Sequence, residues 1–524
     1  MYFTSSIFIA FLAVMLILYY IVPRKAQWVL LLIGSYVFYA WAGVHFLAYV
    51  LTTTVTTWYS AVRISDRQSQ HKRWMKVNKN DLTREEKKAA KAVMKKITRR
   101  WFLFALLLNL GILAVIKYTN FMIGNINAIF GTGLGFWSIA LPMGISFYTF
   151  QSMGYLIDVY HGKVEAQRNL GKFALFVSFF PQMVQGPISR YNDLAPSLFG
   201  EHKFDAKGIR YGMERILWGF FKKLVIADRL VIGVKALITS PEQYTGAWVA
   251  MAMFLYAIQL YADFTGGIDV TIGVAQMFGV KLVENFDRPF FSKDTAEYWR
   301  RWHISMGSWF RDYIFYPISV CGWMLKLTNW SRKHLGNFIG KRVPVYLAMA
   351  VTWFATGIWH GAAWNFIVWG MLNCLVLVIS QELNPFYEWF HSKVHVQGKL
   401  GWKLFQVVRT FVLMSSIRIL DCYRDVPLTF HQVGTVFTTA NLGEVFTGLT
   451  GLGMGWADWV IVVLGTLLML AVSLIQRKGS VREQLDSRPA AVQAAVFAVL
   501  IYVVLIFGAY GIGFDANQFI YNQF

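Results

Sequence analysis

One histidine of this sequence lies inside a long apolar stretch. The charged residues nearest to His360 are Arg342 and Glu382, 18 and 22 positions away. A titratable side chain in such a setting marks a pathway or a reaction site by default. A neutral imidazole can serve as the general base for an attacking hydroxyl, or it can carry an acyl group transiently. A hydrogen-bonded structural histidine is the alternative interpretation.

The residues around His360 favour close packing. Positions 357–365 read GIWHGAAWN, in which glycines permit close backbone approach or a helix break and tryptophans form flat walls. Trp359 and Asn365 are therefore candidate substrate contacts beside a candidate catalytic His360. The charge-free run 343–381 has 39 residues, which is too long for one membrane helix. It predicts short or re-entrant helices that meet near the histidine.

A second group of hydrogen-bond donors lies at 298–313, which reads YWRRWHISMGSWFRDY. Its apolar positions fall on one helical face with cations beside them. The pattern predicts an interfacial helix along the membrane surface, which is either a plain amphipathic anchor or part of the site. The candidate site residues in this group are Arg300, Arg301, Trp302 and His303.

Two further segments place polar side chains in apolar surroundings. Asp263 lies in IQLYADFTGGIDVTIG and Gln185 in FFPQMVQGPISRY. Both are candidate substrate contacts, and helix-to-helix hydrogen bonding is the alternative. Prolines close the short run 173–180, which predicts a re-entrant segment. Lys222 and Lys223 are expected to extend their ammonium groups to the cytosolic interface.

The elements that must position these residues are membrane helices. The chain is 56% hydrophobic and 15% charged, whereas soluble domains have roughly 45–50% apolar and 25% charged residues. The apolar runs predict an all-α polytopic membrane protein with about eleven to thirteen membrane helices, some of them re-entrant, in one membrane domain that fills 1–524. Besides 343–381, the candidate segments are 5–22, 27–43, 45–61, 101–116, 135–156, 244–280, 403–417, 459–475 and 490–512.

The positive charge of the chain indicates its orientation. The net charge is +22, and the segment 63–100 holds 14 Lys and Arg against four acidic residues. The positive-inside rule places this basic loop in the cytosol and the N-terminus outside. Within it, a helix is expected over Leu82–Met94, with Thr83 as N-cap. Its lysines either attract a polyanionic acyl donor or lie on anionic membrane lipid as an orientation signal.

Cysteine usage gives no sign of a metal or disulfide framework. The three cysteines are scattered through the second half of the chain, so neither a zinc site nor a set of disulfides is predicted. No permanently bound cofactor and no nucleic-acid partner are expected.

Several blocks together resemble the signatures of the membrane-bound O-acyltransferase (MBOAT) family. They are LPMGISFYTFQSMGYLIDVY, FPQMVQGPISRY, QLYADFTGGIDVTIG, WRRWHIS with WFRDY, and GIWHGAAWNF, and they lie between Leu141 and Phe366. The resemblance is closest to the bacterial polysaccharide branch, whose members O-acetylate alginate or peptidoglycan or D-alanylate teichoic acid.

The resemblance implies roles for the two histidines. His360 matches the essential histidine of the family and His303 the second histidine of the motif. A central funnel through the helices would let a cytosolic acyl donor meet an acceptor from outside. His303, with Arg300 or Arg301, is then expected to orient the donor or its thioester carbonyl.

The sequence departs from the family pattern in two places. Gly267 stands where a tyrosine is often found, and the residues ILDCYRD follow Arg418 in place of a shorter aromatic-arginine pattern. No role is therefore assigned to the region after Arg418.

The expected function is O-acetyl transfer from cytosolic acetyl-CoA, across a bacterial inner membrane, toward an exported polysaccharide or peptidoglycan. Family precedent implies a separate secreted serine-type transferase at the external face, because no serine-hydrolase domain is seen in the chain. D-alanyl transfer from an acyl carrier protein is the enzymatic alternative. A transporter or flippase is the other alternative, and it would favour repeated halves that the sequence does not show.

The end of the chain is expected to form an external aromatic tail. Residues 513–524 follow a charge-free span and include four aromatic residues, and QFIYNQF resembles a tail that recurs in this branch. Such a tail either rests at the lipid headgroups or docks a secreted partner.

Overall fold

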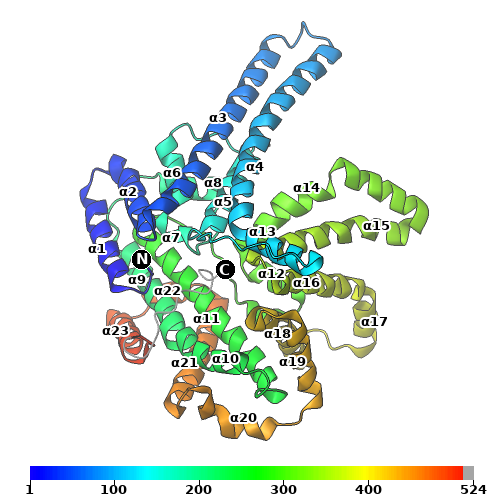
Figure 1. Cartoon of the computed structure of the whole chain (residues 1–524). Helices are drawn as coiled ribbons and strands as arrows, with labels where there is room; N and C mark the ends of the chain where they lie inside the picture. Colours follow the sequence, from blue (N-terminus) through cyan, green and yellow to red (C-terminus); the bar gives the residue numbers. More distant parts are fainter. Residues whose placement is uncertain (511–524) are drawn as a thin grey trace. The chain divides into compact units, whose positions relative to one another are not determined.

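The described part of the chain is built from helices. The computed structural model describes residues 1–510, and the tail predicted at 513–524 lies outside the described residues. Apart from one isolated bridge between Phe286 and Trp302, the regular elements within 1–510 are helical (Figure 1). The all-α fold class is therefore confirmed.

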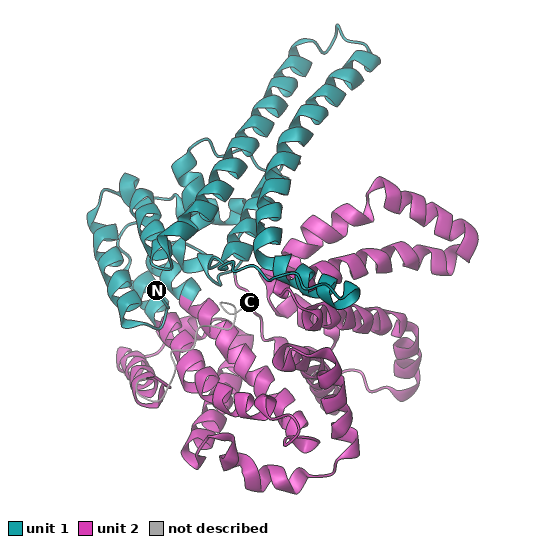
Figure 2. Cartoon of the chain, in the orientation of Figure 1, with its two compact units in different colours: residues 1–213, 271–283 teal, residues 214–270, 284–524 magenta. Residues whose placement is uncertain are grey.

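The helices group into two compact units, coloured separately in Figure 2. Unit 1 comprises 1–213 with 271–283, and unit 2 comprises 214–270 with 284–524. The helices α9 (Ala206–Phe220) and α11 (Ala247–Met277) contribute residues to both units. The prediction of one domain over 1–524 stays a prediction.

In unit 1, α3 packs against α4 and α5, and α2 packs against α1 and α6. The helices of this unit are α1 (Ser6–Ile21), α2 (Gln27–Ala40), α3 (Leu47–Val77), α4 (Arg84–Phe130), α5 (Ile145–Tyr160), α6 (Leu170–Ser178), α7 (Phe180–Met183) and α8 (Tyr191–Leu198). The run 173–180 is divided between α6 and α7, two short helices, and its re-entrant course stays a prediction.

The basic segment 63–100 is a helical hairpin and not an irregular loop. It consists of the end of α3 and the beginning of α4, which extend side by side in Figure 1. The hydroxyl of Thr83 accepts from the backbone N–H of Glu86 at 3.2 Å, and the Glu86 carboxylate accepts from Thr83 N–H at 2.8 Å. The N-cap predicted at Thr83 is therefore present. The cytosolic location of the hairpin stays a prediction.

In unit 2, α16 packs between α15 and α18, and its buried Trp369 forms a hydrophobic core with Ile417 and Leu420 of α18. Besides α9 and α11, the α-helices and π-helical turns of this unit are η3 (Phe221–Ala227), α10 (Asp228–Thr239), α12 (Thr295–Arg301), α13 (Ile304–Phe310), η5 (Arg311–Phe315), α14 (Tyr316–Ser319), α15 (Gly322–His360), α16 (Trp364–Glu382), α17 (Asn384–Val394), α18 (Leu400–Tyr423), α19 (Val426–Thr438), α20 (Leu442–Gly448), α21 (Trp456–Ile475), α22 (Val481–Asp486) and α23 (Ala490–Phe507).

Five helices of the described chain are long and apolar enough to cross a membrane. They are α4, α11, α16, α21 with the turn after it, and α23, and α1 is a shorter apolar helix. The sequence predicts eleven to thirteen membrane segments, a larger number, because it also counts short and interrupted apolar runs. One such run, 135–156, is helical only from Ile145 onward, since residues 131–144 have no regular helix.

Candidate active site

Glycines at the crossing of α15 and α16 determine where His360 lies. Two helices meet near His360 as predicted, because α15 ends at this residue and α16 begins four residues later, but α15 is not short and has 39 residues. A Cβ on Gly357 would lie 2.5 Å from the carbonyl oxygen of Phe366, and one on Gly370 would lie 2.5 Å from that of Trp353. Small residues permit such close backbone approach at membrane helix crossings, and here only glycine fits.

Aromatic rings enclose the side chain of His360, which is 7% exposed. Its ring centroid lies 4.6 Å from that of Trp369, 5.1 Å from that of Trp359 and 6.4 Å from that of Phe366. A Cβ on the next residue, Gly361, would fall 2.2 Å from the ring of Phe366, so glycine lets this ring cover the imidazole. An enclosed site of this kind limits access of water, which would otherwise hydrolyse a reactive acyl donor.

His303 lies at a break between two short helices. The prediction of one interfacial helix over 298–313 is wrong, because α12 ends at Arg301, α13 begins at Ile304, and His303 has a φ of 48°. A non-glycine residue in this left-handed region costs about 1–3 kcal/mol and persists where surrounding contacts hold it. The apolar side chains expected to share one face are buried within the protein; they are Tyr298, Trp302, Met306, Trp309, Phe310 and Tyr313.

Asn285 holds His303 and determines its tautomer. The amide oxygen of Asn285 accepts from the backbone N–H and the hydroxyl of Ser305, both at 3.0 Å, and lies 3.2 Å from Nδ1 of His303. Because a backbone N–H can only donate, the Asn285 atom that faces it is the oxygen. Nδ1 of His303 therefore carries the proton and donates, which leaves the lone pair on Nε2.

The His303 imidazole is neutral at physiological pH. Burial, and then the positive charge of Arg418, lower the pKa of His303 to about 3. A group with so low a pKa is a poor proton acceptor, but its Nε2 can still accept a hydrogen bond. This arrangement suits a positioning role.

Trp359 and Arg418 join the two histidines into one cluster. The ring of Trp359 lies 6.0 Å from that of His303 and 5.1 Å from that of His360. The guanidinium carbon of Arg418 lies 5.0 Å from the ring of Trp302 and 5.1 Å from that of Trp369, within cation–π range. The structure thus brings His303, His360, Trp359 and Trp302 together around a buried cation. We refer to this group with Trp369 and Arg418 as the histidine cluster.

The other predicted site residues of unit 2 have different surroundings. Asn365 donates its side-chain amide to the carbonyl of Leu420 at 3.2 Å and thereby ties α16 to α18. Arg301 forms an ion pair with Glu297 at 2.7 Å. Arg300 is exposed and lines a separate cavity. Asn365 thus supports the histidine cluster, whereas Arg301 pairs with an acid of its own helix.

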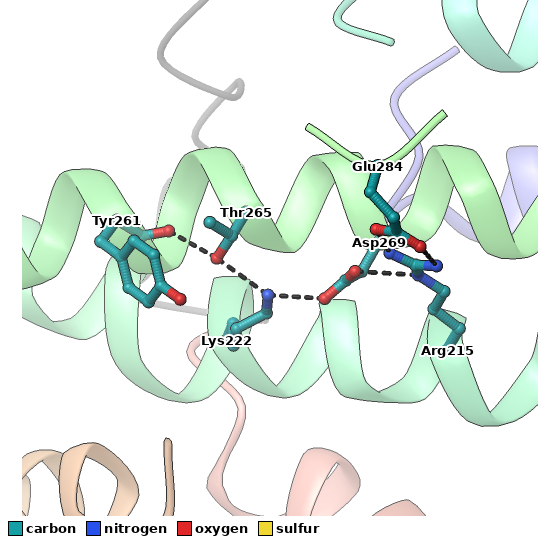
Figure 3. A network of polar contacts seen from close by, with 6 residues as sticks. All are labelled: Arg215, Lys222, Tyr261, Thr265, Asp269 and Glu284. Carbon is teal, nitrogen blue, oxygen red and sulfur yellow. Dashed lines mark hydrogen bonds and ion pairs between the residues drawn. The ribbon is translucent and has the colours of Figure 1, made fainter. Parts of the chain in front are cut away.

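A second polar group, an ion network, lies between α9, η3 and α11 (Figure 3). Lys222 Nζ lies 2.6 Å from the carboxylate of Asp269 and donates to the hydroxyl of Thr265 at 2.8 Å. Arg215 contacts the other oxygen of Asp269 at 2.9 Å and binds both oxygens of Glu284 at 2.6 Å. Bidentate pairing of this kind is strong and geometrically specific. The network lines a cavity of about 610 Å³.

The expectation that Lys222 and Lys223 reach the membrane interface is wrong. Both side chains are buried, and Lys223 Nζ lies 2.6 Å from Asp263 and 2.8 Å from Asp228. The reason is the close approach of α9 to α11, where a Cβ on Gly219 would lie 2.6 Å from a carbonyl oxygen of α11. The lysines therefore meet the carboxylates of α11, and Asp263 is an ion-pair partner of Lys223.

Gln185 belongs to unit 1. Its side chain is 1% exposed, and within residues 1–510 neither its amide nitrogen nor its amide oxygen has a hydrogen-bond partner. A buried amide without partners is unfavourable, which is consistent with a ligand contact. The role of Gln185 as a substrate contact stays a prediction.

Sequence reasoning assigns no role to Arg418, Asp421 or Asn285, although the structure places them beside the candidate catalytic residues. For the first two the sequence contained a signal, namely an Arg and an Asp three positions apart at the end of an apolar segment. For Asn285 it contained none, because its role depends on the backbone break at His303, 18 residues later. Among the described residues no group of three or more His, Cys, Asp or Glu side chains is placed to hold a metal ion.

The sequence is similar to known membrane enzymes. Residues 166–422 match the family described as MBOAT, membrane-bound O-acyltransferase. The probable alginate O-acetylase of Pseudomonas syringae is 35% identical over 445 residues, which cover 84% of this chain and 75% of that protein. The corresponding protein of Pseudomonas aeruginosa is 34% identical over 88% of this chain and 81% of its own length. The peptidoglycan O-acetyltransferase of Helicobacter pylori is 28% identical over 74% of this chain and 72% of its own length.

Helical fold, apolar spans and sequence similarity together define a multi-pass membrane enzyme that transfers acyl groups to oxygen. The chain belongs to the membrane-bound O-acyltransferase family. The predictions of the family, the fold class and the enzyme class are therefore confirmed.

Proposed function

We propose that this protein transfers an acetyl group from acetyl-CoA toward an exported polysaccharide or peptidoglycan. The relatives that cover most of the chain are named for O-acetylation of alginate or peptidoglycan. The teichoic acid D-alanyltransferase of Bacillus subtilis is 27% identical over only 48% of the chain. The similarity thus favours acetyl over D-alanyl as the transferred group.

The observation that carries this proposal is the enclosure of His360 by aromatic rings in the histidine cluster. In the proposed reaction the acceptor hydroxyl oxygen attacks the thioester carbonyl carbon, and His360 takes the hydroxyl proton. The carbon–sulfur bond then breaks, and the thiolate leaving group receives the proton from the imidazole. An acyl-histidine at the same side chain is the alternative route.

His303 is proposed to position one of the substrates. Its lone pair at Nε2 accepts a hydrogen bond and cannot stabilise the oxygen of a thioester carbonyl. Of the two roles expected for His303, the tautomer therefore supports orientation of a hydroxyl or N–H group of a substrate.

Donor and acceptor are proposed to meet from opposite sides of a bacterial inner membrane. The basic hairpin 63–100 supports a cytosolic side for acetyl-CoA and an external N-terminus, because clustered Lys and Arg residues favour the cytosol. A separate secreted serine-type transferase at the external face would then place the acetyl group on the polymer.

The test is substitution of His360 by glutamine. His360→Gln retains a polar side chain of similar size but cannot take a proton, so acetyl transfer should fall by about 10²–10⁴-fold. Purified protein in nanodiscs with radiolabelled acetyl-CoA and an oligosaccharide acceptor measures this directly. His431→Ala, at an exposed histidine of α19, is the matched control and should retain full activity. Activity of His360→Gln close to that of the wild type would contradict the proposed base.

A further inference from the structure

A second cavity of unit 2 has a lining unlike that of the ion-network cavity. Its volume is about 490 Å³, and it is lined by α12 with the two residues before it, by one residue of α15, by the end of α16, by α17 and by the first half of α18. Its cations are Lys293, Arg300 and Arg409, and its single carboxylate is that of Asp294. We refer to it as the cationic cavity.

The positive charge of the cationic cavity is not balanced by its own lining. Asp294 serves as the N-cap of α12, where it accepts from the backbone N–H of Glu297 at 2.7 Å. Arg409 donates to the backbone carbonyl of Lys293 at 2.8 Å, which ties α18 to the residue before the N-cap of α12. The lining thus holds three cations and one carboxylate, and that carboxylate already accepts a backbone hydrogen bond.

The ion-network cavity is different, because its charges cancel. Its lining includes four cations (Arg215, Lys222, Arg288 and Arg482) and four carboxylates (Glu214, Asp269, Glu284 and Asp287). The pairs shown in Figure 3 lie at 2.6 to 2.9 Å. That cavity satisfies its own charges, whereas the lining of the cationic cavity holds more cations than carboxylates.

Two aromatic residues of the cationic cavity add polar atoms that lack partners. The ring nitrogen Nδ1 of His391 and Nε1 of Trp402 are buried and have no hydrogen-bond partner within residues 1–510. The two rings are in edge contact at 5.5 Å. An indole N–H can only donate, so it requires an acceptor atom. Buried polar groups of folded proteins are normally satisfied, which points to a ligand with acceptor oxygens.

We propose that the cationic cavity binds a phosphate group. Phosphate carries the negative charge that the lining lacks, and its oxygens accept from arginine, lysine and indole donors together. The volume is large enough for a phosphate with part of the molecule attached to it. Two sources share this chemistry: a phosphate of the acyl donor, which rests on the proposed function, and the headgroup of an anionic phospholipid.

The position of the cavity relative to His360 limits the first source. Ser380 of the cavity follows Trp369, which contacts His360, by 11 residues on α16. At 1.5 Å per residue this separation is about 16 Å along the helix. A donor with its phosphate in the cavity therefore needs a flexible arm of about that length to carry its acyl group to the histidine cluster.

The site itself is tested with inorganic pyrophosphate. Its binding to the full-length protein in phosphatidylcholine nanodiscs is measured by equilibrium dialysis. Arg300→Gln and Arg409→Gln should each raise the dissociation constant about tenfold or more, because a charge-assisted contact is lost. Lys333→Gln, at an exposed lysine of α15 outside the lining, is the control and should change nothing. Unchanged affinity in both arginine variants, or absence of binding to the wild type, overturns the proposal.

The source of the phosphate is tested with two donors and two lipid compositions. If the donor supplies it, the arginine variants should raise KM for acetyl-CoA about tenfold and leave KM for S-acetylpantetheine, which has no phosphate, unchanged. If a lipid supplies it, the variants should affect both donors equally and abolish any stimulation by added phosphatidylglycerol. If the wild type uses neither thioester, the proposed function fails, while pyrophosphate binding still decides the phosphate site.

Discussion

Replacement of Arg418 by methionine should destabilise the histidine cluster by an amount that depends on pH. The Arg418 guanidinium lies 5.0 to 5.9 Å from three tryptophan rings and 3.2 Å from the carboxylate of Asp421. Three cation–π contacts at about 0.5–1 kcal/mol each account for a loss of about 1.5–3 kcal/mol. Methionine fills much of the volume of the stem, so we expect little additional cost from a cavity.

The rest of the loss in the free energy of unfolding comes from Asp421, and protonation of its carboxyl limits that loss. Burial raises the pKa of Asp421 to about 6, and the charge of Arg418 opposes this increase. Without Arg418 the Asp421 carboxyl can take up a proton and so avoid an uncompensated charge. At pH 7, one unit above a pKa of about 6, holding this proton costs about 1.4 kcal/mol, which is the upper limit of the electrostatic loss. Arg418→Met should therefore cost about 3–4 kcal/mol at pH 7 and about 1.5–3 kcal/mol at pH 6.

The sign of the pH effect follows from proton counts. In the variant the folded state holds a proton on Asp421 that the unfolded state has lost, so the free energy of unfolding decreases as pH rises above 6. The measurement is denaturant unfolding in detergent at pH 6 and pH 8 for Arg418→Met, Asp421→Asn and the double variant. Lys403→Met, at an exposed lysine of the same helix, is the control.

In the Asp421→Asn background the cost of Arg418→Met should be the same at both pH values, because no carboxyl remains to titrate. Acetyl transfer by Arg418→Met should also fall at least tenfold, since Trp302 and Trp369 lose their shared contact. An equal cost of Arg418→Met at pH 6 and pH 8 in the presence of Asp421 would refute the coupling of the two residues.

Three further predictions concern stability, packing and orientation. His303 takes up a proton below about pH 6.5 in the unfolded state, but only near pH 3 in the folded state. Acidification from pH 7 to pH 5 should therefore lower the free energy of unfolding of the wild type by about 2 kcal/mol more than that of His303→Asn, as measured by denaturant unfolding. Gly370→Ala places a Cβ 2.5 Å from a backbone oxygen and should cost about 1–3 kcal/mol in thermal unfolding, whereas Gly401→Ala, with open space around it, should be neutral. After removal of the native cysteines, Ser69→Cys should resist a membrane-impermeant thiol reagent in intact cells, and labelling from outside would reverse the predicted orientation.

Features that depend on neighbouring residues could be predicted from the sequence. The end of one helix at His360 and the start of the next follow from glycines in a charge-free run too long for one span. The cap at Thr83 follows from a threonine three positions before a glutamate. The apolar positions of 298–313 are buried, but the single helix that their periodicity predicted is interrupted at His303.

Features that depend on distant residues needed the tertiary structure. The break at His303 is held by hydrogen bonds to Asn285, and a local periodicity contains no information about that partner. Lys222 is buried because Asp269, 47 residues later, neutralises it, whereas the sequence alone favours an interfacial lysine.

The sequence by itself determined that this chain is a helical membrane protein with a histidine in an apolar setting, because hydropathy and short-range spacing are local properties. Only the tertiary structure decided that Arg418 stands between Trp302 and Trp369, 116 and 49 positions away in the chain. A buried cation is stable only among partners that compensate its desolvation. Helix packing selects those partners, and no single segment of the sequence specifies it.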